Sequence, residues 1–296
     1  MFFHGIFSCV EYVKYTYALV DRKNKVLLDW SAKSGSAVGV MMFLRHMGLL
    51  EEANKDTRWI HNYRIDVFYR KFGLATYRDL IDPSFVKLKI VRNPFDRVVS
   101  SYIHTMLYPT AEIKAITGNQ RPDMTFREFL RAISTLDLSI CNSHYQTQFR
   151  PYEAEGVVFD HILHLERFAE DVAKANERSG LSLNPNGLSS HHHVKKDEAL
   201  SSSALDMKWS ALSGQIPRYS NFYDSGDGEA VRLVSRLYEK DFVSYGYPME
   251  ITGQGIIAPS CPVTNSRGPL ARRLSLMKYS VYDILRNVAN SLHKRF

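Results

Sequence analysis

The amino-acid sequence predicts an α/β fold, a P-loop-like three-layer sandwich in which helices flank a central parallel sheet. Twice, a short β-branched run is followed by a loop and then by a longer apolar stretch, and two such units in succession imply a parallel sheet. The composition agrees, because 45% hydrophobic and 23% charged residues over 296 positions are ordinary for a protein with a dense core.

The first unit begins with a predicted hairpin. Residues 10–20 and 25–30 are rich in β-forming side chains and flank the polar turn DRKN at 21–24. The second run contains a strand over Val26–Trp30. The small, flexible sequence SAKSGSA then leads into an apolar run over 37–50 that favours a buried helix.

The second unit has the same order of elements. The run FVKLKIV at 85–91 predicts a strand, and Asn93-Pro94 places a proline near the start of a helix with the sequence FDRVVSSYIHTML. The sequence TFRE at 125–128 fits a capping box before FLRAI. A further strand over VVFDHILHLE precedes a helix that ends at Gly180.

The last third of the chain is less regular. Residues 181–228 are rich in Ser, Asn, Gly and His, which predicts substrate loops around a short helical piece. Helical periodicity returns over 229–242 and 272–292. We therefore expect one domain over 1–250 and a basic extension over 251–296, whose amphipathic helix packs on the domain or on a partner copy. Peripheral contact with an anionic membrane is the alternative for that helix.

Charge and cysteine content narrow the range of partners and compartments. A net charge of +7 suits an anionic ligand, and no RNP-like motif points to nucleic acid. Three scattered cysteines and the adjacent His191, His192 and His193 lack metal-ligand spacing, so we expect no metal and no disulfide framework. With neither a signal peptide nor a membrane-spanning run recognised, the expected location is the cytoplasm.

The first chemical motif is the segment Lys33-Ser34-Gly35-Ser36-Ala37 between the first predicted parallel strand and its helix. At that position backbone N–H groups and the positive end of the helix can face a phosphate, and the lysine adds a full charge. The lysine precedes the glycine, so the segment is not a Walker A loop. A flexible turn with a surface lysine is the alternative.

The second motif lies in VRNPFDRVVSSY, where Arg92 ends the strand and Ser100 follows eight residues later on the helix. An arginine fork and a nearby hydroxyl can hold one phosphate from two sides. The carboxyl ends of parallel strands are also where open α/β sheets bind ligands. Alternatively, Arg92 and Arg97 are helix-end residues that form salt bridges.

Together these motifs resemble the two phosphosulfate-binding sequences of sulfotransferases that use 3′-phosphoadenosine 5′-phosphosulfate (PAPS), most closely the carbohydrate sulfotransferases of sulfotransferase family 2. The resemblance covers about residues 20–247 and continues in order through TFREFL, NSHYQTQF, FDHILHLERFAEDV and LYEKDFVSYGY. It implies that residues 1–250 form a sulfotransferase domain. It also implies a site for the 5′-phosphosulfate at Lys33, Ser34, Gly35, Ser36 and Ala37, and a site for the 3′-phosphate at Arg92 and Ser100.

Three positions depart from the family pattern. Ala32 and Ala37 stand where the family usually has proline and a hydroxyl or cysteine residue. Because Ala37 has no side-chain donor, Ser36, Ser34 and backbone N–H groups are left to hold the 5′-phosphate, and a catalytically weak module that binds PAPS or its product PAP stays open. Asn93 replaces the usual aspartate and removes a negative charge near the expected 3′-phosphate.

The resemblance implies in-line sulfuryl transfer to a carbohydrate hydroxyl, with an O- or N-acceptor on a small metabolite as the alternative. Lys33 would neutralise the leaving oxygen without a metal. For the base that takes the acceptor's proton, we favour His61, then His144, then Glu51 or Glu52, although His61 also fits a structural role. His161 and His164 are expected to be structural. A kinase is disfavoured, since no kinase signature occurs.

Overall fold

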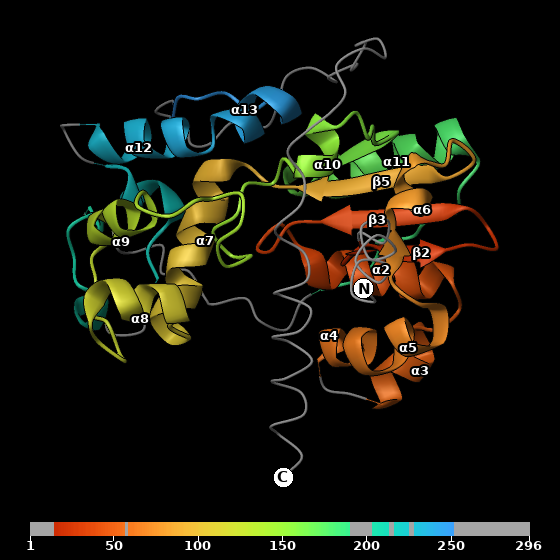
Figure 1. Ribbon diagram of the computed structural model, residues 1–296, viewed down its shortest axis with the longest axis horizontal. Helices are drawn as coiled ribbons and strands as arrows, with labels where there is room; N and C mark the ends of the chain where they lie inside the picture. The colour runs from red at the N-terminus through yellow and green to blue at the C-terminus, as the bar shows by residue number, and fades with distance from the viewer. Residues whose placement is uncertain (1–14, 57–58, 190–202, 213–215, 225–227, 252–296) are drawn as a thin grey trace, which may run out of the picture.

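The computed structural model describes residues 15–56, 59–189, 203–212, 216–224 and 228–251. Its centre is a four-stranded sheet in the order β2-β3-β5-β6, formed by Leu19–Asp21, Val26–Trp30, Val86–Val91 and His161–His164 (Figure 1). Strands β3, β5 and β6 are parallel, while β2 is antiparallel to β3. The predicted α/β fold is therefore confirmed, with a mixed, mostly parallel sheet.

The predicted hairpin is β2, a turn over 22–25 and β3. Leu19 lies opposite Leu28, and the Asp21 carboxylate accepts hydrogen bonds from the N–H groups of Lys23 and Asn24, both at 3.1 Å. The strand β1, Tyr15–Thr16, does not join this sheet but pairs with β4, Ala75–Thr76. The hairpin delivers β3 to the middle of the sheet, where all five of its residues are buried.

Helices cover both faces of the sheet. One face packs against α2 (Ser36–His46), α3 (Leu50–Asp56), α4 (Ile60–Tyr63) and α11 (Phe168–Ser179). There Gly39 lets α2 approach β5, since a Cβ on it would lie 2.2 Å from Ile90 Cδ1. On the other face Lys89 is fully buried and lies over the rings of Tyr152 in α10 (Pro151–Ala154) and Tyr245 in α13 (Glu239–Tyr245).

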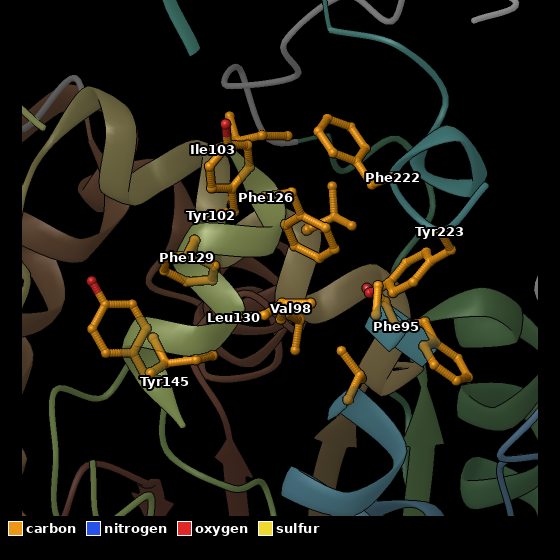
Figure 2. Packing of buried hydrophobic residues seen from close by; sticks show 14 of the residues in the cluster. Phe95, Val98, Tyr102, Ile103, Phe126, Phe129, Leu130, Tyr145, Phe222 and Tyr223 are labelled. Atoms are coloured by element: carbon orange, nitrogen blue, oxygen red, sulfur yellow. The ribbon is translucent and has the colours of Figure 1, made fainter. Parts of the chain in front are cut away.

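A second core lies around α7 (Pro94–Leu107), the helix that follows β5. Its aromatic side chains interlock with those of α9 (Phe126–Ile133) and of the segment around residues 222–223, as Figure 2 shows. The predicted capping box starts α9: Glu128 N–H donates to Thr125 Oγ1 at 3.1 Å, and Thr125 N–H donates to the Glu128 carboxylate at 2.8 Å. Helix α8 (Ala111–Thr117) and α12 (Glu229–Leu237) complete this part.

Several boundaries differ from those expected. The apolar run over 37–50 is divided, because α2 ends at His46 and Gly48 has a φ of 72° before α3 begins. The helix expected over 229–242 is likewise divided at Tyr238 into α12 and α13. The described part of 181–228 contains two short 3₁₀ turns, Trp209–Leu212 and Tyr219–Phe222.

The remaining described elements connect these layers. They are a π-helical turn at Arg64–Phe68, α5 (Tyr69–Phe72), α6 (Tyr77–Ile81) and a 3₁₀ turn at Leu165–Arg167. The predicted extension, apart from Ile251, and the three adjacent histidines at 191–193 lie outside the described residues. Within the described ranges, no helix has the length and apolar character to cross a membrane.

Candidate active site

The turn after β3 is held by its own polar groups. Ser34 is fully buried; its hydroxyl donates to the Ser31 carbonyl at 2.6 Å, and its N–H donates to the same carbonyl at 3.2 Å. Lys33 and Gly35 have positive φ angles of 67° and 85°. Since a lysine rarely adopts this conformation, its surroundings must hold it there.

Two arginines of the second motif hold this turn. Arg92 Nη1 donates to the Lys33 carbonyl oxygen at 3.1 Å, and Arg97 Nε donates to the Ala32 carbonyl oxygen at 2.9 Å. The parallel register brings the two motifs together, because Trp30 at the end of β3 pairs with Ile90 near the end of β5. Consecutive carbonyl groups of the first motif are thus bound by guanidinium groups of the second.

Neither arginine forms an ion pair with a described residue, which argues against the helix-end salt bridges. Instead Arg92 lies over the Tyr219 ring at 5.4 Å and Arg97 over the Tyr238 ring at 5.8 Å. Arg97 is fully buried, and its Nη1 has no hydrogen-bond partner within the described ranges. A buried cation without a paired carboxylate favours an anion nearby.

Lys33 adds a third positive charge. Its ammonium group makes no hydrogen bond or ion pair with the residues that the structure describes. Burial and, after it, the charges of Arg92 and Arg97 lower the pKa of Lys33 from 10.5 to about 8. The lysine stays protonated at neutral pH, and an anionic ligand would stabilise that charge.

Helix α2 begins directly after the turn, with Gly35 as its N-cap. The N–H groups of its first turn have no partners within the helix and lie at the positive end of its dipole, which suits an anion. The hydroxyl of Ser36 lies 3.3 Å from His61 Nε2, and Ala37 packs against the hydrophobic cluster beneath the sheet. Among the side chains of this segment, the lysine is therefore the one free to bind a ligand.

The end of β5 is held by residues that sequence reasoning did not single out. The side chain of Gln148 accepts from Arg92 N–H at 2.9 Å and donates to the Arg92 carbonyl at 2.7 Å. The buried Asp241 carboxylate accepts from the N–H groups of Gln148 and Phe149, both at 2.8 Å. Both residues lie in sequence blocks that carry the family resemblance, and that position was the sequence signal that could have identified them.

Ser100 and Asn93, two further positions of the second motif, have different roles. Ser100 is half-buried on α7, and its hydroxyl makes no hydrogen bond with the described residues, so it is available to a ligand. Asn93 is the N-cap of α7 and accepts from Phe95 N–H at 2.9 Å. An aspartate could make the same cap, so asparagine keeps the helix start while removing a charge.

His61 lies beside the first motif. Its Nε2 faces the Ser36 hydroxyl, and its Nδ1 is buried without a partner among the described residues. Burial and, after it, the charge of Arg64 lower the pKa of His61 from 6.5 to about 3. The imidazole is therefore neutral at neutral pH.

His144 lies beside the second motif and stacks on His104, with ring centroids 4.1 Å apart and an interplanar angle of 18°. Burial lowers the pKa of His104 to about 4, with Lys33 contributing, and that of His144 to about 3, with His104, Lys33 and Arg97 contributing. Sequence reasoning missed His104, although it lies one helical turn after Ser100 in α7.

The other candidates have surroundings of a different kind. Glu51 and Glu52 are exposed on α3, where Glu52 accepts a hydrogen bond from the Tyr63 hydroxyl at 2.9 Å. His164 bonds through both ring nitrogens, to Asp171 and to the Tyr245 carbonyl, as a structural residue would. In the described ranges, no cluster of acidic, histidine or cysteine side chains has the arrangement of a metal site.

Comparison with known proteins adds one finding. A family model described as the sulfotransferase family matches residues 18–248, a span that contains every residue of the site above. Comparison with curated proteins and with solved structures finds no match.

Proposed function

The chain belongs to the sulfotransferase family, and from that premise we propose that it transfers the sulfuryl group of PAPS to a hydroxyl of a carbohydrate or a similar polar acceptor. The observation that carries the proposal is the hydrogen bond from Arg92 to the Lys33 carbonyl, because it joins the two predicted phosphate-binding motifs at one edge of the sheet. Three cations without carboxylate partners in the described chain meet there. Such a site suits a ligand with several negative charges.

We assign the two ends of the donor to the two motifs. Lys33 and the free N–H groups at the start of α2 would bind the 5′-phosphosulfate, and Arg92 with Ser100 would bind the 3′-phosphate. The hydroxyl of Ser34 is occupied within the turn, so its part is to shape the turn. The fully buried Arg97 supports both ends by holding the Ala32 carbonyl and adding positive potential.

The chemistry that follows is transfer between two oxygens. Bound PAPS supplies an activated sulfuryl group, whose bond to the 5′-phosphate oxygen breaks while the acceptor oxygen bonds to sulfur. Lys33 stabilises the charge that collects on the leaving oxygen. A base removes the acceptor's proton, and the candidates are His61, which faces the Ser36 hydroxyl, and His144, on which Lys33 and Arg97 act.

Two exposed aromatic side chains support a carbohydrate acceptor. Tyr108 is 67% exposed with its ring centroid 5.3 Å from that of His104, and Trp59 is 44% exposed with its ring centroid 5.0 Å from that of His61. Flat aromatic faces pack well against the C–H faces of sugar rings. A small metabolite with a hydroxyl or amine is the second candidate. On the composition and motifs above, we also propose a cytoplasmic location and no nucleic-acid partner.

The competing proposal is a module that binds the nucleotide without efficient transfer. It is favoured by Ala37, which has no hydroxyl to offer the phosphate and is partly buried against the hydrophobic cluster. The two proposals share the donor site and differ only in turnover.

Calorimetry and a transfer assay test the proposal. We expect PAP to bind and ATP to bind far more weakly, and we expect labelled sulfate to pass from PAPS to at least one member of a panel of polysaccharides, glycolipids and small polar metabolites. Lys33→Ala should lower turnover by about 10²-fold or more, because the leaving oxygen loses its cation. Preference for ATP would contradict the donor assignment, and PAP binding without transfer would favour the module.

A further inference from the structure

The side chains of Asn142 and His144 are arranged so that the tautomer of the histidine is determined. The backbone N–H of His144 donates to Asn142 Oδ1 at 3.1 Å, and because an N–H needs an acceptor, this atom of the Asn142 amide is the oxygen. His144 Nδ1 lies 2.8 Å from the same oxygen and must therefore carry the proton that it donates. In a neutral ring this leaves Nε2 unprotonated, as a general base requires.

The free nitrogen of His144 is available for a proton. Nε2 makes no hydrogen bond with the described residues, and it is not among the buried polar atoms that lack a partner. Nε2 therefore reaches solvent in a half-buried side chain. An acceptor hydroxyl could approach it without breaking an existing contact.

The segment that carries His144 is tied to both donor motifs. Ser101 Oγ, one residue after Ser100 on α7, donates to the His144 carbonyl at 2.7 Å. Arg97 donates to the Ser143 carbonyl at 3.5 Å and, through Nε, to the Ala32 carbonyl at 2.9 Å. The backbone that carries His144 is therefore hydrogen-bonded to side chains of α7, one of which also binds the donor turn.

His104 contacts the His144 ring through a stacked face. It lies in the last turn of α7, stacked on His144 at a centroid distance of 4.1 Å, and Tyr108 packs against it in turn. The three rings form a row that runs from the exposed Tyr108 to His144. A stacked neutral ring limits the orientations that His144 can adopt.

His61 lacks these features. Its Nε2 faces the Ser36 hydroxyl at 3.3 Å, and its Nδ1 is buried with no partner in the described chain to fix the tautomer. Its contacts are those of a residue that positions the start of α2.

We infer that His144 is the general base of the reaction, held as the Nδ1–H tautomer by Asn142, with His104 as a stacked positioning residue and His61 as a positioning residue of the donor turn. The inference rests on the proposed sulfuryl transfer. As the acceptor oxygen bonds to sulfur, its proton passes to His144 Nε2, and the electron pair of the broken S–O bond stays on the 5′-phosphate oxygen. The imidazolium then releases the proton to solvent.

The charges around the pair agree with this assignment. Lys33, Arg97 and His104 are the titratable groups that act on His144, and after burial they lower its pKa to about 3. The ring is thus uncharged throughout the neutral range, with its one proton on Nδ1. A bound donor anion would offset Lys33 and Arg97 and raise the basicity of the ring when the reaction needs it.

Substitutions at three positions test the inference against PAP affinity and turnover. His144→Ala should lower kcat by about 10²- to 10⁴-fold while PAP affinity stays within about twofold, because the donor contacts remain. Asn142→Leu should cost roughly 10- to 100-fold in kcat through loss of orientation, whereas Asn142→Asp keeps the acceptor oxygen and rescues most of it. The added carboxylate should also raise the pKa of His144 and shift the acidic limb of the pH profile upward.

Matched variants separate the roles of the histidines. His104→Phe keeps a stacked ring and should retain most turnover, while His161→Gln, which loses a histidine bonded to Ser179 away from the site, should have no effect. A loss in His104→Phe as large as that in His144→Ala would assign the base to His104 and overturn the inference. Full turnover in His144→Ala, with Lys33→Ala inactive, would overturn it as well.

A readout independent of transfer keeps the two proposals distinguishable. In ¹⁵N-histidine spectra of the full chain at pH 7, His144 should be neutral and protonated at Nδ1, with its signal assigned by its loss in His144→Gln. An Nε2–H tautomer would contradict the inference. The expected tautomer in a chain that binds PAP and transfers sulfate to no acceptor would contradict the proposed function instead.

Discussion

At the scale of single residues, the site is defined by three clustered positive charges, and the buried Asp241 carboxylate acts on Arg97 without forming an ion pair with it. Lys33, Arg92 and Arg97 lie close enough for the two guanidinium charges to act on the lysine, and none of the three has an ion-paired carboxylate in the described ranges. The folded chain thus carries an electrostatic cost at this edge of the sheet that a polyanion removes. Binding and protonation of Lys33 should therefore be coupled.

We predict that PAP binding takes up protons near pH 8.5. The pKa of Lys33 is about 8 without ligand, so the lysine is mostly neutral at pH 8.5, and the anion should raise its pKa and draw a proton in. Affinity should accordingly fall as the pH rises through about 8, while the ligand-free fold gains stability over the same rise because the cost of the buried charge disappears. Calorimetry in buffers of different ionisation enthalpy measures the uptake.

The control for this coupling is Lys71, a lysine that packs against Phe72. Lys33→Met should abolish the uptake at pH 8.5, and Lys71→Met should preserve it. Equal proton uptake in both variants would mean that a group other than Lys33 titrates on binding.

At the scale of elements, the site depends on the turn between β3 and α2. Gly35 is the N-cap of α2 with a φ of 85°, and a Cβ there would lie 2.5 Å from Leu165 Cδ1. Leu165 directly follows β6, so the turn is packed against the residue after that strand and is also bound by Arg92, directly after β5, and by Arg97 of α7. The turn can take one shape only while all three neighbours are in place.

We predict that Gly35→Ala damages the site more than a comparable change elsewhere. Gly48 provides the matched control, because it too has a positive φ, 72°, but nothing lies within 4 Å of an added Cβ. Gly48→Ala should cost about 1 kcal/mol of stability and leave PAP affinity unchanged. Gly35→Ala adds a clash to that strain and should cost about 3 kcal/mol, with markedly weaker PAP binding.

Thermal unfolding and calorimetry on both variants check this prediction. Equal losses of stability, with equal PAP affinity, would show that Leu165 can move aside and that the turn is not tightly packed.

At the scale of the whole molecule, three distant segments are joined behind Arg92. Asp241 on α13 binds the backbone at Gln148, the side chain of Gln148 binds the backbone of Arg92, and the buried Lys89 donates to the Gln148 carbonyl at 2.8 Å. Lys89 is itself paired with Glu153 and lies 3.7 Å from Asp29 in β3. The buried polar network thus links both cores to the strand end that carries the arginine.

We predict that Gln148→Leu weakens PAP binding although we place Gln148 outside the donor contacts. Its loss leaves the N–H and C=O groups of Arg92 without partners, which should cost about 1–3 kcal/mol of stability and lower PAP affinity by roughly 10-fold as Arg92 shifts. The control is Gln146→Leu, which also loses two hydrogen bonds, to the Cys141 carbonyl and from Arg150, but none to Arg92.

Unfolding in denaturant and PAP titration distinguish the outcomes. If both glutamine variants lose stability but bind PAP as tightly as the unmodified chain, Arg92 keeps its position without Gln148 and the network serves stability alone.

The sequence by itself determined the elements and the two motifs. Strand and helix periodicity, the capping box at Thr125 and the turn after Trp30 depend on local interactions, which a linear pattern records. It also located Lys33 and Arg92 at strand ends, because the parallel order of β3 and β5 follows from their connection. Boundaries were less accurate where a single residue such as Gly48 or Tyr238 interrupts an apolar run.

Only the tertiary structure decided which side chains face the site and which hold it. Ser34 turns inward, Arg97 is buried beside the Ala32 carbonyl, and Asn142 orients His144 next to His104. These arrangements depend on how segments far apart in the chain pack together. Such contacts carry no local periodicity. They arise because buried polar groups must find hydrogen-bond partners wherever the packed layers bring them within reach.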